Sequence, residues 1–274
     1  MIAQTLPPPK IAGGPYIVGI LNLTPDSFSD GGRWSGHDAL AHALTMLDAG
    51  ADIIDIGGES TRPGAESVDE RVEIDRVTPV IRTLRGKTNA PISIDTMKPA
   101  VALAAFAAGA KLWNDVLALR APGALESAVA LKAPVVLMHM KGEPRTMQQD
   151  PVYEDVVAEV IAFLRGRVQA AEAKGLSNLW VDPGIGFGKT LAHNMALLAA
   201  VGRIRDEVGK PVLIGASRKS FIAKLDPRAA DADKRVGGSV AAALIAAQNG
   251  AAMLRVHDVA ETAQALKLWR ATQG

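Results

Sequence analysis

The stretch LWVDPGIGFGK, residues 179–189, decides the fold. A short apolar run, residues 179–181, stops at the carboxylate of Asp182, and Pro183 and three glycines follow before a helix-like segment begins at Thr190. This pattern predicts a buried strand that carries a charge at its carboxyl end. Glycines after such a strand let a ligand lie against the backbone, because they have no Cβ. Taken alone, the stretch is equally typical of an ordinary βα loop in which a carboxylate caps a helix.

The same alternation of an apolar run and a helix-period segment occurs eight times along the chain. The runs are residues 16–21, 52–56, 91–94, 110–113, 134–138, 179–181, 211–214 and 252–256. The helical segments are residues 38–49, 68–84, 99–108, 123–131, 152–174, 191–208, 234–249 and 259–271. Apolar runs without polar alternation are typical of parallel strands covered on both faces. Eight such units predict an α/β protein, a single (β/α)8 TIM barrel over residues 16–274, with residues 1–15 as an N-terminal cap or tail. A doubly wound open sheet is the alternative.

Composition excludes several classes of protein. The 274 residues carry 30 basic and 29 acidic side chains, a formal charge of +1, whereas nucleic-acid binders rest on a net basic surface. No apolar run approaches the roughly 18 residues of a membrane span, and residues 1–9 hold no hydrophobic signal core, so we expect no membrane partner. The chain has no cysteine, which excludes disulfides and thiolate metal sites. We therefore expect a cytoplasmic location.

Polar residues close all eight runs, at the end of the strands where the active site of a barrel lies. They are Asn22, Asp55 with Glu59, Asp95, Asn114 with Asp115, His139, Asp182, residues 217–220, and Arg255 with His257. Asp and Asn also occur at such places as helix caps and turn residues. The mixture of donors and acceptors nevertheless suits a flat heterocycle rich in hydrogen-bonding groups. Asp95, Asn114, Asp182 and Lys219 are the residues that offer it.

An anion site is predicted where the seventh and eighth runs end, since those loops are the usual phosphate site of this architecture. Arg255 and His257 point the same way on strand periodicity, and arginine offers paired hydrogen bonds to such an anion. A surface ion pair with a loop histidine is the alternative. Asn22 precedes a polar loop, residues 24–32, whose length and paired glycines favour a lid. Its amide offers one oxygen to Mg²⁺ if the substrate's phosphates supply others.

Three familiar motifs are excluded. Residues 184–190 fail as a phosphate-binding P-loop because Pro183 stands where the first glycine belongs. The five histidines show no zinc-ligand spacing. No serine lies in a nucleophile elbow, since Ser217 is followed by Arg218 and Lys219 rather than by x-Gly. We therefore expect no covalent nucleophile.

Five segments resemble the motifs of the dihydropteroate synthase family, in that family's order. They are residues 19–32, 55–65, 182–189, 215–221 and 255–259, which span nearly the whole chain. Two departures are minor: Lys141 stands where a glutamine-like residue is usual, and Leu23 where valine is common. Neither position is assigned to a ligand. Without a kinase or aldolase segment, the chain resembles the single-function form.

The resemblance implies an enzyme of folate synthesis in which 4-aminobenzoate displaces diphosphate from (7,8-dihydropterin-6-yl)methyl diphosphate to give 7,8-dihydropteroate. The implied pterin ligands are Asp95, Asn114, Met138, Asp182, Phe187 and Lys219. The implied diphosphate ligands are Asn22, Thr61, Arg255 and His257, with Mg²⁺ as the cofactor on Asn22. The implied aminobenzoate and sulfonamide positions are Phe28, Thr61, Arg62, Pro63 and Ser220. The implied catalytic residues are Asp95, Lys219, Arg255 and His257.

The implied chemistry rests on charge. If diphosphate leaves before the weakly nucleophilic amine attacks, Asp95 would stabilise a cationic dihydropterin. The aminobenzoate loops would order after the pterin, which predicts that the pterin binds first. The resemblance also implies a homodimer, although the alanine-rich helices late in the chain could equally pack on the barrel.

Two other functions remain open at this point. One is a pterin-binding paralogue without transferase activity, against which the intact anion residues Asn22, Arg62, Lys219, Arg255 and His257 weigh. The other is a pterin-dependent methyltransferase domain of the corrinoid type, which uses the same barrel. The two loop motifs ending near Gly32 and around Arg62 argue against it.

Overall fold

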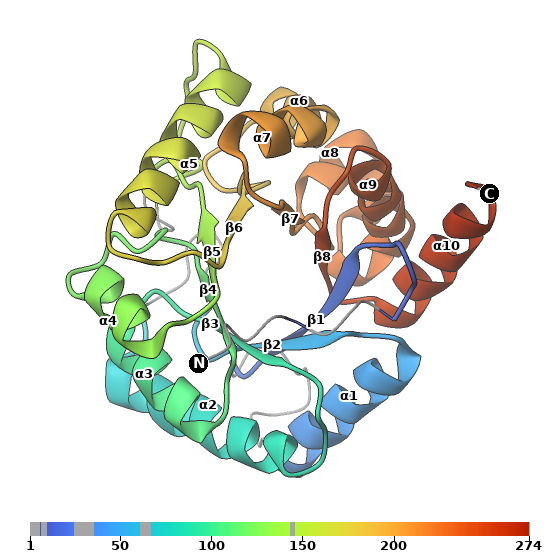
Figure 1. The fold of residues 1–274 in the computed structure, drawn as a ribbon. Coiled ribbons are helices and arrows are strands. Elements are labelled where there is room, and N and C mark those ends of the chain that lie inside the picture. The colour runs from blue at the N-terminus through green and yellow to red at the C-terminus, as the bar shows by residue number, and fades with distance from the viewer. Residues whose placement is uncertain (1–5, 7–9, 25–35, 61–66, 143–145, 274) are drawn as a thin grey trace.

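The computed structural model describes residues 6, 10–24, 36–60, 67–142 and 146–273. Parallel strands form its centre (Figure 1). They are β1 (Tyr16–Asn22), β2 (Ile53–Gly57), β3 (Ile92–Asp95), β4 (Leu112–Asp115), β5 (Val135–Met138), β6 (Leu179–Asp182), β7 (Leu213–Ile214) and β8 (Met253–Val256). Their order is β6-β5-β4-β3-β2-β1-β8-β7. A parallel bridge from Val181 to Val212 brings β6 beside β7. The ring therefore closes, which confirms the TIM barrel and rules out the open doubly wound sheet.

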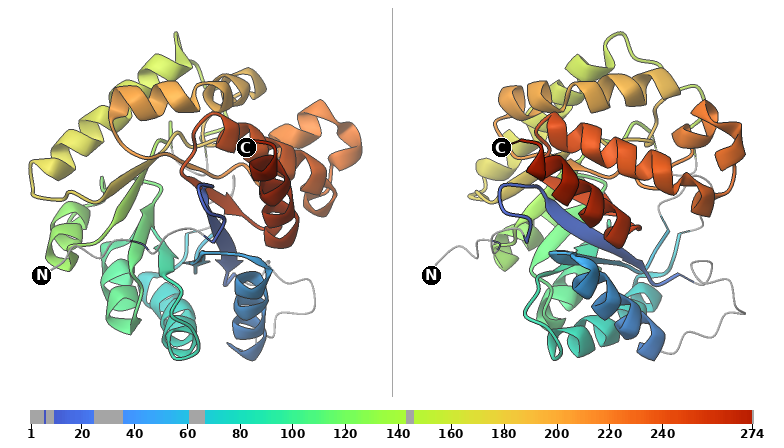
Figure 2. Two further views of the ribbon diagram at one scale, coloured as in Figure 1. Left: turned by 45° about the vertical axis from the view of Figure 1, so that its right-hand side comes forward. Right: turned by 90° about the vertical axis from the view of Figure 1, so that its right-hand side faces the viewer.

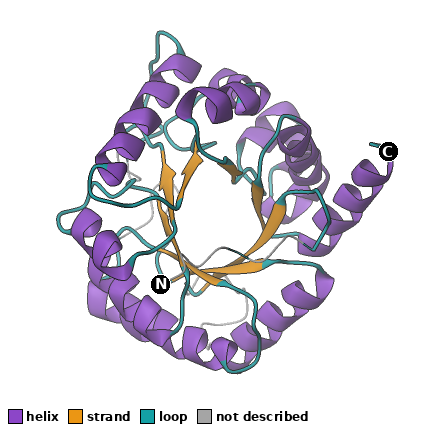
Figure 3. Cartoon of the chain, viewed as in Figure 1, coloured by secondary structure: helices purple, strands orange, loops and turns teal. Residues whose placement is uncertain are grey.

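Helices surround this ring (Figure 3). They are α1 (Gly36–Ala49), α2 (Glu70–Arg85), α3 (Pro99–Ala108), α4 (Ala124–Leu131), α5 (Val156–Glu172), α6 (Leu191–Ala199), α7 (Val201–Val208), α8 (Phe221–Leu225), α9 (Val236–Gln248) and α10 (Val259–Ala271). Neighbouring helices pack on one another, as α9 and α10 do (Figure 2). None of the helices among the described residues has the length and apolar character needed to cross a membrane.

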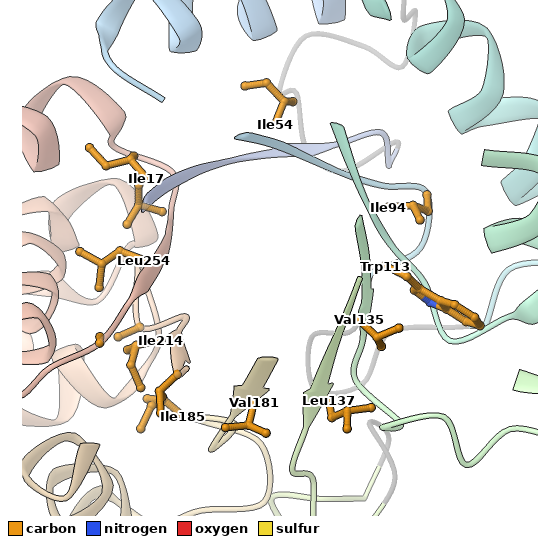
Figure 4. Close-up of a cluster of buried hydrophobic side chains, with 14 of the residues drawn as sticks. Ile17, Ile54, Ile94, Trp113, Val135, Leu137, Val181, Ile185, Ile214 and Leu254 are labelled. Atoms are coloured by element: carbon orange, nitrogen blue, oxygen red, sulfur yellow. The ribbon is translucent and has the colours of Figure 1, made fainter. Parts of the chain in front are cut away.

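Each strand divides its side chains between two cores, because successive residues point to opposite faces. The outer core lies between strands and helices, and Ile17, Ile54, Trp113 and Leu254 point into it, away from the barrel centre (Figure 4). A separate cluster consists of alternate residues of six strands. It contains Val18, Ile53, Leu112, Val136, Leu213 and Met253, with Leu6, Tyr16 and Trp180 packed against it. One apolar layer therefore fills the interior of the barrel below the strand ends.

The structure departs from the sequence prediction mainly in the last third of the chain. The single helix predicted over residues 191–208 is two helices, α6 and α7, which meet at Ala200. The loop after β7 contains the short helix α8 and two 3-10 turns, η2 (Pro227–Ala229) and η3 (Ala232–Arg235). The periodicity predicted neither α8 nor η2, and the last two residues of η3 are the first two of the helix predicted over residues 234–249. A helix as short as α8 is set by its packing rather than by its own propensity. The predicted cap or tail stays a prediction, since residues 1–5 and 7–9 lie outside the described residues.

Candidate active site

The strand register brings the predicted polar residues to one end of the barrel. Asp95 pairs with Gly57 on one side and with Asn114 on the other, and Met138 pairs with Asp182. Gly57 in turn pairs with Asn22. Residues at equal height on neighbouring parallel strands share one face of the ring when their side chains point the same way. These pairings therefore bring the carboxyl ends of β1 to β6 together around one mouth.

Two glycines show how closely this ring is drawn together. A Cβ added to Gly57 would lie 3.4 Å from Asn22 Oδ1 and 3.7 Å from Asp95 Cβ. A Cβ added to Gly215 would lie 3.8 Å from Arg255 Cβ and 3.9 Å from Asp182 Oδ2. Because the glycines have no Cβ, no further side chain stands between these groups of the neighbouring strands.

Arg255 is the central cation of the mouth. Its Nε donates to Asp55 Oδ2 and its Nη2 donates to Asp95 Oδ2, each at 2.6 Å. Burial alone would lower the pKa of the guanidinium, but the charges of Asp55 and Asp95 outweigh burial and raise it. Burial is also the first cause that raises the pKa of Asp95, to about 7, against the opposing charge of Arg255. One cation therefore compensates two buried acids only in part.

Several buried acceptors face this region without a donor among the described residues. Asp55 Oδ1, Asp95 Oδ1 and Asn114 Oδ1 are three of them, and Ser93 Oγ on β3 is another. Asn114 Nδ2 donates to Asp55 Oδ2 at 3.4 Å, which turns the amide oxygen away from that carboxylate. A buried acceptor without a donor costs free energy, about 1–3 kcal/mol each. Such a set in one mouth indicates a ligand that supplies several N–H groups.

Asp182 is the last residue of β6. Its Oδ1 accepts from the backbone N–H of Gly184 at 2.6 Å. Burial raises the pKa of the carboxyl group, while the charge of Lys219 opposes the rise. Burial likewise lowers the pKa of Lys219 to about 8, with Asp182 acting against it. Lys219 Nζ also lies 4.5 Å from the centre of the Phe187 ring. Acid, amine and ring thus form one wall of the mouth.

The glycine-rich loop behind that wall is held at every carbonyl from residue 184 to residue 188. The donors are backbone or side-chain groups, several of them from other elements. Gly184 O accepts from Phe187 N, Ile185 O from Lys219 Nζ, Gly186 O from Gln148 Nε2, Phe187 O from Lys189 Nζ and Gly188 O from Tyr153 Oη. Satisfied backbone groups leave the loop little reason to rearrange. Asp182 and Phe187 are therefore presented on a fixed frame.

The loop after β7 and the end of β8 meet through Ser217 and His257. The backbone N–H of His257 donates to Ser217 Oγ at 3.1 Å, and His257 Nδ1 lies 3.1 Å from the same oxygen. Arg218 instead pairs with Asp258 through both Nε and Nη2. Arg218 follows the seventh strand, where the sequence predicted an anion site, but its guanidinium already binds the carboxylate of Asp258.

Two strand-end acids serve the backbone rather than the mouth. Asp115 is fully buried, and its oxygens accept from the backbone N–H groups of Leu117 at 2.8 Å and Leu119 at 2.7 Å. Glu59 accepts from Val68 N at 2.9 Å and pairs with Lys98 at 2.8 Å. The capping and turn alternative is therefore confirmed for Asp115.

The remaining predicted residues fall into two groups. Asn22 ends β1 beside Gly57, and Ser220 is exposed next to Lys219. Phe28, Thr61, Arg62 and Pro63 lie outside the described residues. The sequence marked Asp55 as a strand-end residue but assigned it no role. It also assigned no role to Lys189, the last residue of the stretch 179–189, because no pattern in the sequence indicates that this lysine is buried.

Comparisons with known proteins agree with this geometry. A family model described as "Pterin binding enzyme" matches residues 18–257. Dihydropteroate synthase of Haemophilus influenzae is 50% identical over 262 residues, covering 94% of each chain. A solved Xanthomonas albilineans dihydropteroate synthase with 4-aminobenzoic acid has a TM-score of 0.90 and 52% identity, covering 96% of this chain and 94% of that one. The same organism's enzyme in complex with 7,8-dihydropteroate gives a TM-score of 0.86 and 49% identity, covering 96% and 95%. The chain therefore belongs to the dihydropteroate synthases, the pterin-binding transferases of folate biosynthesis.

Proposed function

We propose that this barrel mouth condenses 4-aminobenzoate with (7,8-dihydropterin-6-yl)methyl diphosphate and releases 7,8-dihydropteroate and diphosphate. The observation that carries the proposal is the gathering of unpaired buried acceptors opposite a buried acid and amine. Asp95 Oδ1 and Asn114 Oδ1 have no donor among the described residues, and Asp182 and Lys219 are buried close enough for their charges to interact. A pterin ring presents both N–H groups and a carbonyl along its edge.

The pterin would match these groups in a definite way. Asp182 would accept from the 2-amino and ring N–H groups, and bonds of this charged kind are worth about 1.5–3 kcal/mol each. Asn114 and Asp95 would take the remaining ring edge, and Lys219 the pterin carbonyl. Met138 and Phe187 would pack on the ring faces; both belong to or pack against one small apolar cluster beside the mouth.

The diphosphate would lie toward β8 and β1. Arg255 has five N–H groups, and its bonds to Asp55 and Asp95 use two of them. The others, together with His257, Asn22 and Thr61, would bind the leaving group. Asn22 Oδ1 borders Gly57 at the mouth, and this oxygen would supply one ligand to Mg²⁺ while phosphate oxygens and waters complete the shell. Mg²⁺ bound there would offset negative charge on the diphosphate.

Charge then explains the acceleration. Departure of diphosphate leaves positive charge on the dihydropterin, and ionised Asp95 would stabilise it in a site largely closed to water. Its bond to Arg255 fixes the carboxylate before the reaction begins. The remaining contribution is positioning, since the amine must meet the methylene carbon while the cation persists.

4-Aminobenzoate would bind last, between Phe28, Thr61, Arg62, Pro63 and Ser220. Ser220 adjoins Lys219 in sequence, so it would lie beside a pterin bound by that lysine. The solved relative with 4-aminobenzoic acid supports this class of second substrate. Calorimetry tests the order: tight binding of aminobenzoate to the protein without diphosphate would contradict the pterin-first scheme.

One assay separates the proposal from the two alternatives. Diphosphate release should require both 4-aminobenzoate and the pterin diphosphate. A binding paralogue would bind the pterin without releasing diphosphate, and a methyltransferase domain would ignore 4-aminobenzoate. Release that proceeds equally well without aminobenzoate would overturn the proposed reaction.

We also propose a homodimer in the cytoplasm. A cavity of about 360 Å³ between α6, α8 and α9 is lined by apolar side chains, including Leu225 and Ile245, which are 61% and 46% exposed. Exposed apolar side chains around such a cavity favour an interface. Light scattering of Ile245→Asp should report a monomer, while an unchanged mass would contradict this interface.

The proposed cytoplasmic location is supported by the composition, because a chain with no cysteine needs no oxidising compartment for disulfide formation.

A further inference from the structure

Lys189 is a lysine that the proposed reaction does not use, yet it is one of the largest fully buried side chains of the protein, at 2% exposure. Burying an ammonium group costs free energy unless it finds partners. Its position just after Gly188 puts it at the end of the loop that carries Asp182 and Phe187. A lysine buried at such a cost beside Asp182 and Phe187 indicates a role in the binding site.

The lysine turns back beneath its own loop. Its Nζ donates to Phe187 O at 3.0 Å and lies 3.1 Å from His139 Nδ1. A Cβ added to Gly184 would lie 3.4 Å from the same Nζ. The ammonium group therefore sits under the first glycine of the loop and joins the loop's far end to the end of β5.

His139 completes the connection. Its backbone N–H donates to Asp182 O at 2.9 Å, and its ring meets the Phe163 ring of α5 edge to face at 4.9 Å. Burial first, and the charge of Lys189 second, lower the pKa of His139 to about 3. The imidazole is therefore neutral, and in the tautomer with its proton on Nε2 its Nδ1 accepts from the lysine.

The charge of Lys189 also faces the pterin acid. Burial lowers the pKa of Lys189 to about 7, whereas the carboxylate of Asp182 raises it and Lys219 lowers it further. The lysine in turn is among the cations that oppose the rise in the pKa of Asp182, after Lys219 and the Gly184 backbone bond. Lys189 and Asp182 therefore stabilise each other's charged forms through the electrostatic field, without a direct hydrogen bond.

We infer that Lys189 is a positioning residue for the pterin: it fastens the Phe187 carbonyl to His139 and so fixes the Phe187 ring and the Asp182 carboxylate. The inference rests on the proposed function, because it assigns the pterin to that wall. Lys189 itself touches no substrate. Without it, the Phe187 carbonyl loses its donor, and pterin binding must order a loop that is now ordered beforehand.

The test compares three single variants: Lys189→Met, Lys189→Gln and the matched control Lys141→Met. Lys141 is a neighbouring lysine with a 44% exposed side chain. Calorimetry with 6-hydroxymethylpterin, which lacks the diphosphate, measures the ring pocket alone. Steady-state assays with the pterin diphosphate and 4-aminobenzoate separate the two KM values.

Lys189→Met should raise the pterin Kd about tenfold or more, the scale of a lost hydrogen bond to a charged group. The KM for aminobenzoate at saturating pterin diphosphate should stay unchanged. Lys189→Gln keeps an N–H donor for Phe187 O, so its pterin Kd should recover most of the loss. Lys141→Met should bind the pterin like the parent protein.

Three results would overturn the inference. The first is a Lys189→Met variant that has a lower Tm than the parent protein but the same pterin Kd, because such a lysine would have only a structural role. Another is an equal rise in both KM values, and the third is a Lys189→Gln variant as impaired as Lys189→Met. If Lys189→Met does not fold, His139→Leu removes the lysine's partner instead and should raise the pterin Kd in the same selective way. If the parent protein fails to bind the pterin, the proposed function itself is wrong. A binding defect in Lys189→Met alone leaves the proposed function intact.

Discussion

Arg255 lies between Asp55 and Asp95 and donates to one oxygen of each at 2.6 Å, while the second oxygen of each carboxylate is buried with no donor among the described residues. Arg255 thus fixes the positions of both carboxylates, and the Oδ1 atom of each remains available as an acceptor for a ligand. The trio carries a net negative charge when all three groups are ionised. Burial first, and the charge of Asp55 in addition, raise the pKa of Asp95 to about 7 against the opposing charge of Arg255.

Arg255→Ala should cost both stability and substrate affinity. Removing one partner of a buried ion pair leaves an uncompensated charge, which costs about 3–5 kcal/mol of the free energy of unfolding. The KM for the pterin diphosphate should rise, because the anion loses its guanidinium. Urea unfolding and steady-state kinetics measure the two effects. The exposed pair of Arg228 with Asp226 gives the matched control, and Arg228→Ala should change neither quantity. A defect confined to the aminobenzoate KM would contradict the diphosphate assignment of Arg255.

Asp182→Asn should weaken pterin binding selectively. The amide keeps an oxygen for the Gly184 N–H, so the loop should hold its shape and the Tm should change little. Its NH₂ group, however, faces the pterin's own donors, and a charged hydrogen bond of about 1.5–3 kcal/mol is lost, which corresponds to about 10- to 150-fold in Kd. Calorimetry measures this, with the exposed Asp206→Asn as control. An unchanged pterin Kd would remove Asp182 from the pocket.

The pH profile of kcat/KM should reach its maximum between about 7 and 8. Asp95 must be ionised to stabilise the cation, and with its pKa raised to about 7 by burial it becomes protonated as the pH falls below that value. Activity should then fall by up to tenfold per pH unit. Above about 8, Lys219 loses its proton, because burial lowers its pKa to about 8. Asp95→Asn should be slow and should lack the acid limb; a variant that keeps this limb would show that another group causes it.

The barrel and the members of its mouth could be predicted because both follow from local sequence. Apolar runs of three to six residues define the strands, and the residue that closes each strand lies at the same end of the ring. Strand alternation predicts that adjacent side chains point to opposite faces, but it does not predict which of the two points into the barrel. Asn114 and Asp115 are adjacent in sequence, yet Asn114 turns to Asp55 inside the barrel whereas Asp115 binds the backbone of its own loop.

Long-range partners were also beyond the reach of the sequence. Asp55 and Arg255 are 200 residues apart, and only the closure of β8 onto β1 brings them together. Lys189 meets His139 because β5 and β6 are neighbours, a relationship that no local pattern contains. The break between α6 and α7 also has a distant partner, since Asn249 Nδ2 donates to Leu198 O at 2.9 Å, although residues 191–208 keep helical periodicity through Ala200.

Asp115→Ala gives the sharpest test of that division between site and scaffold. Asp115 is fully buried, and its oxygens accept the part-buried backbone N–H of Leu117 and the buried N–H of Leu119, so the alanine variant leaves both donors unpaired, at about 1–3 kcal/mol for a buried one. The free energy of unfolding should therefore fall by several kcal/mol, and the KM values of the folded fraction should stay as they were. Asn114→Ala, one residue earlier, should do the reverse, because its oxygen is an unpaired acceptor of the mouth: pterin Kd should rise while urea unfolding changes less. If both variants raised the pterin Kd alike, Asp115 would belong to the ligand site after all.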